Sequence, residues 1–537
     1  MSTIRKFGAV AALGTSTAAL AMVTGLAGAR ADDLQVNQQL LNTRVDQLAA
    51  VGENPGQGAV FSVDQNAAAG AAVTAGSFPR SILIPGTDTS FKVYGQMTEV
   101  LDYYMSGGPV NNSPWNTTVG ANGQVQSAPL GNAGVTKARS DGIFGQSARE
   151  SKFGIETRTP TPFGEARTVF EFDWAGSTTF APGGGDPTSV SDNIVPRLRY
   201  GYGTLGGLLA GQATSNFSDP DANGETLDFG GNVGEPGHVR IPQVRYTMPA
   251  WWGASFSVSA EQPDTIIATQ VGVEAQDAGV VPTATTTCPV PTAGSVSVAT
   301  AETCTTAVLT SGSTPLNPAK TSAPDLTAAY YIPQPWGHLD FSAVLRPGID
   351  VDDGKYFARD YIGYGGHIGL DFKPGWFGWA KDDFILQFEG GDMIGPFVNS
   401  STNFDLATNY GAAGSATSAG TYGGLNGPTT AASAAAIIFK PTQEMGGELG
   451  YQHWWLDNLR SNINAGFNAH YGIPIKLVGA TQANAINKEL ITAHANLIWN
   501  PVSFVDIGLE YTWGQRTVLN NTTGSMNVLI SKLAFRF

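Results

Sequence analysis

The last nine residues, Leu529 to Phe537, alternate between two kinds of side chain and end on an aromatic residue. Successive residues of a β-strand point to opposite faces. One face carries Leu529, Leu533, Phe535 and Phe537, and the other carries Ile530, Lys532, Ala534 and Arg536. An apolar outer face and a polar inner face are typical of a transmembrane β-barrel strand, so we expect Phe535 and Phe537 to be its assembly signal. Taken alone, the pattern also fits an amphipathic edge strand of a soluble sheet.

The N-terminal residues have the form of an export signal. Arg5 and Lys6 precede an apolar run from Ala9 to Leu26, and Ala29-Arg30-Ala31 has the A-x-A form of a cleavage site. These features predict a secretory signal peptide over residues 1–31. Beyond it there is no run of about 18 apolar residues that would form a spanning helix. If the chain crosses a membrane, it therefore does so as a closed barrel.

Composition agrees with this class. Charged residues make up 14% of the chain and the formal net charge is −15, whereas a soluble domain has roughly 25% charged residues. An acidic chain of this kind does not look like a nucleic-acid-binding protein. Its 537 residues would suggest several soluble domains by length alone, but the strand pattern predicts one large closed sheet with long loops.

Strand signals come in pairs, joined alternately by long polar segments and by short turns rich in Pro, Gly and Trp. We count about sixteen strands, and an even number leaves both chain ends in the periplasm. The expected strands are 91–104, 152–158, 165–174, 197–203, 208–214, 239–248, 255–262, 325–332, 338–346, 361–372, 384–390, 443–453, 461–471, 489–499, 504–516 and the closing strand 529–537.

Alternation within these strands separates an apolar face from a charged or amide face. In 152–158, for example, Phe153 and Ile155 alternate with Lys152 and Glu156. The polar face must point inward, because lipid cannot hydrate it. A soluble β-sandwich would also alternate, but most tryptophans lie at or beside the short turns, where an aromatic girdle is expected.

Two segments precede the predicted barrel domain of residues 89–537. Leu34, Leu41 and Leu48 recur every seven residues with Val45 between them, which predicts a periplasmic coiled coil over residues 32–51. Three heptads are marginal alone, so a fraying amphipathic helix is the alternative. Residues 52–88, rich in Ala and Gly, are predicted to be a flexible linker.

Several motifs resemble the DcaP-like porins of Gram-negative outer membranes. They are Ser151-Lys152-Phe153-Gly154-Ile155-Glu156-Thr157-Arg158-Thr159-Pro160, Leu208-Leu209-Ala210-Gly211-Gln212 and Glu225-Thr226-Leu227-Asp228-Phe229-Gly230. Trp499-Asn500-Pro501 and the stretch from Asp506 to Tyr511 are also similar, as in porins more widely. The resemblance runs from about Ile82 onward. It implies a homotrimer of sixteen-stranded barrels, an N-terminal coiled coil and uptake of small anionic solutes such as dicarboxylates.

The loop after the fifth strand, residues 215–236, is the expected constriction. Its Leu227-Asp228-Phe229-Gly230-Gly231 resembles the inward-folded third loop of general porins. The loop carries Asp219, Asp221, Glu225 and Asp228. Alternation points Arg158, Arg167, Arg197 and Arg199 inward across the lumen, and Arg245 joins them if a bulge near Pro242 resets the phase. Acids facing arginines would create a transverse field that sieves solutes; alternatively, these arginines only pair with Glu156, Glu171 and Asp173.

Signals of catalysis are weak. Gly201 to Gly206 matches G-x-G-x-x-G, but another strand follows it instead of a helix. We find no H-E-x-x-H pair and no G-x-S-x-G elbow. The run from Asp219 to Gly224 begins like a calcium loop, yet its twelfth position is Gly230 where Glu is required. We expect no enzyme activity, no cofactor and no metal.

These features predict an outer-membrane porin for passive diffusion of small anionic solutes, with outer-membrane lipid, lipopolysaccharide and the barrel assembly machinery as partners. The alternatives are a general or sugar-selective porin, a structural outer-membrane anchor, a barrel lipase and an energised receptor.

Cys288 and Cys304 lie in one long loop between the seventh and eighth strands. Strand parity places this loop outside the cell, so we expect a disulfide more than a reactive thiol or a metal pair.

Overall fold

The computed structural model describes residues 74–109, 124–126, 128–130, 140–176, 196–236, 239–268, 273–275, 318–352, 354, 356–375, 381–399, 404–409 and 434–537. The expected signal peptide, the expected coiled coil, most of the expected linker and both cysteines, Cys288 and Cys304, lie outside these residues.

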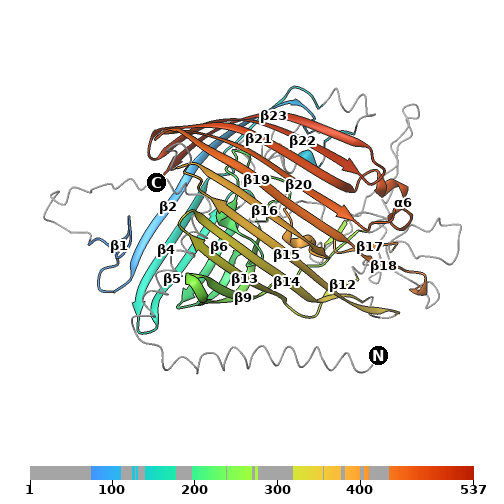
Figure 1. Cartoon of the computed structure of the whole chain (residues 1–537), viewed down its shortest axis with the longest axis horizontal. Helices are drawn as coiled ribbons and strands as arrows, with labels where there is room; N and C mark the ends of the chain where they lie inside the picture. Colours follow the sequence, from blue (N-terminus) through green and yellow to red (C-terminus); the bar gives the residue numbers. More distant parts are fainter. Residues whose placement is uncertain are drawn as a thin grey trace, which may run out of the picture.

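Sixteen antiparallel strands close into a barrel (Figure 1). Each strand pairs with the next along the wall, and β23 pairs with β2 to close the sheet. All sixteen predicted strands are present, so the predicted fold class is confirmed. The barrel strands are β2 (Ser90–Ser106), β4 (Lys152–Thr161), β5 (Gly164–Asp173), β6 (Arg197–Leu205), β7 (Leu208–Thr214), β8 (Arg240–Pro249), β9 (Ser255–Glu261), β13 (Asp325–Gln334), β14 (Gly337–Asp352), β15 (Ala358–Phe372), β16 (Asp383–Asp392), β19 (Gln443–Leu456), β20 (Leu459–Tyr471), β21 (Asn487–Val502), β22 (Val505–Val518) and β23 (Thr523–Arg536).

The barrel wall is apolar outside and polar inside. On the outer face Ile463 is 66% exposed and Leu449 is 51% exposed, while the inward Glu510 is fully buried. A soluble sandwich would bury its apolar face instead. Large apolar side chains exposed around a closed sheet, with carboxylates and amides inside it, are the pattern of a barrel that faces lipid.

The aromatic C-terminal residue takes part in barrel closure. Gly95 of β2 exchanges two backbone hydrogen bonds with Phe537: the Gly95 amide donates over 3.2 Å, and the Phe537 amide donates back over 3.0 Å. A side chain at position 95 would collide with the Phe537 ring and the Lys152 carbonyl. The first and last strands are therefore joined up to the final residue.

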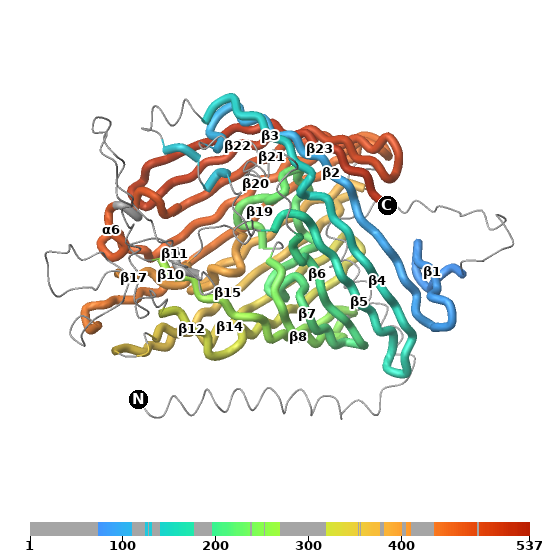
Figure 2. The backbone as a smooth tube through the Cα atoms, turned by 180° about the vertical axis from the view of Figure 1, so that it is seen from behind, coloured from blue at the N-terminus to red at the C-terminus, as the bar shows by residue number. Residues whose placement is uncertain are grey.

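The described chain also contains smaller elements outside the sixteen barrel strands, and these were not predicted from the sequence. Four short strands form a second sheet near α6, at the barrel end away from the C-terminus (Figures 1 and 2). Ala268, Ala407 and Val478 belong to one buried apolar cluster there, which ties the sheet to the helix. None of the helices in the described part of the chain is long and apolar enough to cross a membrane. The sheet comprises β10 (Ile266–Ala268), β11 (Val273–Ala275), β17 (Leu406–Thr408) and β18 (Phe439–Pro441), and the remaining elements are α6 (Ile475–Ala483), β1 (Ile82–Leu83), β3 (Ile143–Ser147), β12 (Ala319–Thr321), η4 (Pro220–Ala222), η6 (Trp251–Gly253) and η8 (Gly395–Phe397).

Candidate functional site: the loop inside the barrel

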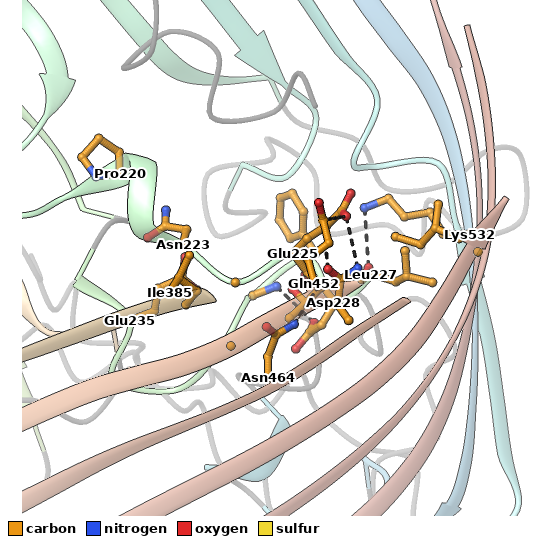
Figure 3. A pocket seen from close by; sticks show the side chains of 18 of the residues that line it. Pro220, Asn223, Glu225, Leu227, Asp228, Glu235, Ile385, Gln452, Asn464 and Lys532 are labelled. Atoms are coloured by element: carbon orange, nitrogen blue, oxygen red, sulfur yellow. Dashed lines mark hydrogen bonds between the residues drawn. The ribbon is translucent and has the colours of Figure 1, made fainter. Parts of the chain in front are cut away.

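The segment between β7 and β8, residues 215–236, lies within the barrel and follows its inner wall. Near its start, the Asp219 carboxylate lies 2.7 Å from Nε2 of His338 on β14. The carbonyl of Ala222 accepts from Gln387 on β16 over 3.0 Å. Further along, the Lys532 ammonium on β23 donates to the Leu227 carbonyl over 3.5 Å (Figure 3). The first half of the segment therefore passes the strands from β14 to β23 in order.

Two wall carboxylates bind the loop backbone. Glu448 on β19 accepts from the Gly224 amide over 3.3 Å and from the Asn232 side chain over 2.7 Å. Glu510 on β22 accepts from the Leu227 amide over 2.7 Å. Because a loop inside a barrel cannot complete a strand ladder, its amide groups need such acceptors.

A two-point ion pair joins the middle of the loop to the wall. The Glu225 carboxylate binds Arg460 of β20 through two hydrogen bonds, of 2.6 Å from Nη2 and 2.7 Å from Nε. Arg460 is almost fully buried, whereas the Glu225 side chain is 27% exposed. Planar, two-point pairing of this kind fixes orientation as well as position.

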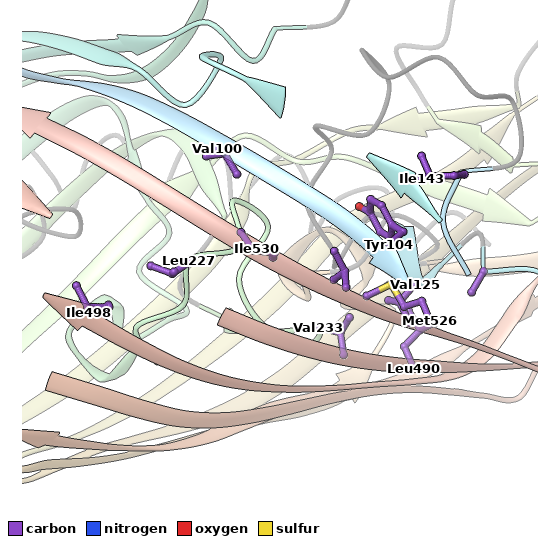
Figure 4. Close-up of a cluster of buried hydrophobic side chains, with 12 residues drawn as sticks. Val100, Tyr104, Val125, Ile143, Leu227, Val233, Leu490, Ile498, Met526 and Ile530 are labelled. Atoms are coloured by element: carbon purple, nitrogen blue, oxygen red, sulfur yellow. The ribbon is translucent and has the colours of Figure 1, made fainter. Parts of the chain in front are cut away.

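Apolar packing adds to this anchoring. Leu227 and Val233 of the loop join a buried cluster with inward-facing Leu490, Ile498 and Ile530 of the wall (Figure 4). Gly508 on β22 leaves room for Leu227, since a Cβ at position 508 would lie 2.6 Å from the leucine side chain. The loop is thus held by hydrogen bonds, an ion pair and a small core.

Beside the loop is a cavity of about 640 Å³ that charged side chains of both signs line. Charges of both signs around one cavity are what a transverse field requires. The basic residues are Lys152, Arg197, Arg199, Arg240, Lys373, Arg460, Lys532 and Arg536, and the acidic residues are Glu150, Asp221, Glu225, Asp228, Glu235, Asp371, Asp383 and Asp506.

Five of the predicted constriction residues line this cavity, and four do not. The five are Arg197, Arg199, Asp221, Glu225 and Asp228. The four others, Arg158, Arg167, Arg245 and Asp219, lie outside its lining. Their part in constriction stays a prediction.

The three arginines outside the lining have partners in the wall or in the loop. Arg158 and Arg167 both bind the Glu156 carboxylate, over 2.7 and 2.8 Å. Arg245 is buried and directs a guanidinium nitrogen to the Asn216 side chain over 3.4 Å, and the β7–β8 register that brings it there is continuous through Pro242. The contacts of Arg158 and Arg167 with Glu156 are among those expected if lumenal arginines pair structurally.

The start of the loop also offers a group of potential metal ligands. Asp219, Asp221 and His338 bring one candidate ligand atom each within 4.8 Å of the others. Asp219 and His338 already satisfy one another through their 2.7 Å hydrogen bond, which accounts for the closeness of this pair without an ion. The second nitrogen of His338, Nδ1, lies 3.6 Å from Asp371.

Several residues of the cavity were not predicted as site residues from the sequence. Lys152, Arg240, Arg460, Lys532 and Arg536 line it, and Glu448 and Glu510 hold the loop. Inward position could be predicted by alternation, as it was for Lys152. Which inward side chains meet the loop depends on pairing among strands that are distant in sequence.

Comparison with known proteins agrees with this architecture. The family model for the porin subfamily matches residues 82–419, and the model for the DcaP outer membrane protein matches residues 443–535. No curated protein matches the chain.

Solved structures show a similar fold. The outer membrane channel DcaP of Acinetobacter baumannii aligns over 86% of this chain and 100% of its own, with a TM-score of 0.57 and 19% identity. OprB of Pseudomonas putida aligns over 83% and 94%, with a TM-score of 0.44 and 8% identity. The anion-selective porin from Comamonas acidovorans aligns over 84% and 100%, with a TM-score of 0.41 and 9% identity. The last two TM-scores are too low to support any argument about this chain.

The predicted resemblance to DcaP-like porins is confirmed by the family match at the C-terminal strands and by the barrel shared with the Acinetobacter channel. The family model that covers most of the barrel shows that this chain belongs to the porin subfamily.

Proposed function

We propose that the protein is a passive diffusion channel that favours small organic anions, dicarboxylates among them. The observation that carries this proposal is the inward-folded loop beside a charged cavity, held against the wall at Glu225, Leu227 and Asn232. A fixed loop of this kind narrows the lumen to solute size. The charges beside it then select among solutes that fit.

The cavity lining does not share the acidic excess of the whole chain. The whole sequence has 29 basic and 44 acidic residues, whereas the cavity lining has eight of each, as named above. The acidic excess therefore lies outside the cavity lining. A permeating solute responds chiefly to nearby charges, because the Debye length is only about 8 Å at physiological ionic strength.

The cellular setting is part of the same proposal. The predicted signal peptide would export the chain, the barrel assembly machinery would insert it, and lipid and lipopolysaccharide would surround it with both termini in the periplasm. We expect a homotrimer, with residues 32–51 forming its coiled coil. The proposed disulfide between Cys288 and Cys304 would order one outer loop without contributing to the barrel wall.

Solute uptake by proteoliposomes tests the proposal. Vesicles containing the purified protein should admit succinate several-fold faster than erythritol, a neutral solute of similar size, while protein-free vesicles admit neither. Equal rates for the two solutes would favour a general porin. Failure of both to enter would favour a structural anchor.

A further inference from the structure

Lys152 of β4 occupies an unusual position on the inner wall. Its cross-strand neighbours are Gln96 on β2 and Asp173 on β5, and both Lys152 and Gln96 line the cavity. A lysine next to an aspartate on one face of a sheet would normally form an ion pair. Lys152 and Asp173 do not form such an ion pair, because residues of the next strand, β6, bind Asp173 instead.

Asp173 is already occupied by two arginines of β6. Arg197 donates to it from Nε over 3.0 Å and from Nη2 over 2.6 Å. Arg199 donates to it from Nη1 over 2.9 Å. With both oxygens engaged, the carboxylate has little capacity left for Lys152.

The other neighbours of Lys152 do not replace Asp173. Gln96 is uncharged and donates its amide to Thr98 over 3.0 Å. Glu171, the acid that attracts Lys152 electrostatically, accepts from Arg199 over 2.8 Å. Among the described residues, Lys152 makes no hydrogen bond or ion pair through its ammonium group.

Most other cations of the cavity are paired, and this sets Lys152 apart. Lys532 binds Glu150 over 2.6 Å, and Lys373 binds Asp371 over 2.6 Å. Arg536 binds Asp506, and Arg460 binds Glu225. The Arg240 guanidinium lies 5.1 Å from the Tyr200 ring. Cations that are already neutralised by a fixed carboxylate attract a solute less than one that is not.

The surroundings of Lys152 strengthen its field. Arg199, Arg240 and Lys532 all act on it repulsively, so several cations converge on one part of the wall. An ammonium group offers three rotatable donors on a flexible stem. The carboxylate of a solute can therefore bind the Lys152 ammonium group in place of Asp173, through charge-assisted hydrogen bonds.

We infer that Lys152 is the anion-binding site of the lumen, where it receives one carboxylate of a permeating small organic acid. Arg197 and Arg199 act indirectly, by holding Asp173 away from it. This inference rests on the proposed function, because it names the residue by which the channel would favour anions.

Block of single-channel current by succinate tests the inference. Lys152→Met should raise the succinate concentration for half-maximal block about tenfold, the equivalent of ~1.4 kcal/mol, while Lys152→Arg should stay within about twofold of wild type. Lys373→Met is the matched control: it removes the same charge from the same cavity, but from a lysine with a fixed partner. It should change half-maximal block less than about twofold.

Equal effects of Lys152→Met and Lys373→Met would overturn the site, because they would show a dependence on overall lumen charge alone. An unchanged half-maximal block in Lys152→Met would overturn it as well.

Chemical restoration of the charge is a second test. In Lys152→Cys, an aminoethyl methanethiosulfonate reagent should restore the charge and the block, with wild type treated alike as the control. A failure to restore block would count against Lys152. A channel that excludes anions altogether contradicts the proposed function, whereas anion preference that survives Lys152→Met contradicts only this site.

Discussion

Individual side chains decide how firmly the loop is seated, and Glu225 is the clearest case. Glu225→Gln would leave Arg460 buried without its carboxylate partner, at a cost below the ~3–5 kcal/mol of a fully buried pair because Glu225 is partly exposed. We predict at least tenfold faster amide hydrogen exchange over residues 223–228, with unchanged heat-modifiable migration of the barrel on gels. Asp457→Asn is the control, since Asp457 pairs with Lys381 over a similar 2.7 Å but is 96% exposed. Equal exchange in both variants would contradict the anchoring role of Glu225.

We predict that Glu235 makes the loop sensitive to pH. Burial raises the pKa of Glu235 to about 8 from its ordinary value of 4.5. The charged or titratable groups that interact electrostatically with Glu235 are His494, Arg240, Asp228 and Glu448. A released loop would have the ordinary pKa, so the seated loop binds more protons between pH 4.5 and 8. The contribution of protonated Glu235 to the stability of the seated loop is therefore complete below about pH 4.5 and is lost as the pH rises through 8.

Hydrogen exchange checks this direction. After correction for the intrinsic rate, residues 230–236 should exchange more slowly at pH 6 than at pH 9, and Glu235→Gln should remove most of the difference. Faster corrected exchange at pH 6 in the wild type would show that the sign is wrong.

At the scale of the elements, closure depends on the last strand and its final residue. Phe537 and Gly95 exchange two backbone hydrogen bonds, and the β23–β2 ladder continues from Arg536 to Asn527. We predict that deleting Phe537 lowers the yield of folded barrel several-fold while export across the inner membrane continues. Heat-modifiable migration measures folding, and removal of the signal peptide measures export. Wild-type amounts of folded barrel would contradict the assembly role of Phe537.

Alternation allows all sixteen barrel strands to be predicted, because each wall strand must be apolar on one face and polar on the other. Short elements such as β10 and β17 escape prediction, since three residues carry no period and their pairing joins distant loops. The same limit holds for the site. The inward position of Arg167 can be predicted from alternation. The ion pair between Arg167 and Glu156 cannot, because it depends on cross-strand register.

At the scale of the molecule, the described barrel strands form a closed sheet, in which each pairs with a neighbour on both sides, around a polar interior. Closure satisfies the backbone within the hydrocarbon layer, and we propose that the loop over residues 215–236 makes the lumen selective. Fold, loop and charge together lead to the central claim, which is diffusion of small solutes with a preference for anions.

The reversal potential of the purified protein in planar bilayers, across a tenfold KCl gradient, tests that claim most directly. We predict discrete conductance steps and a potential displaced toward the chloride equilibrium value. A displacement toward the potassium value, or an absence of conductance from folded protein, would contradict it.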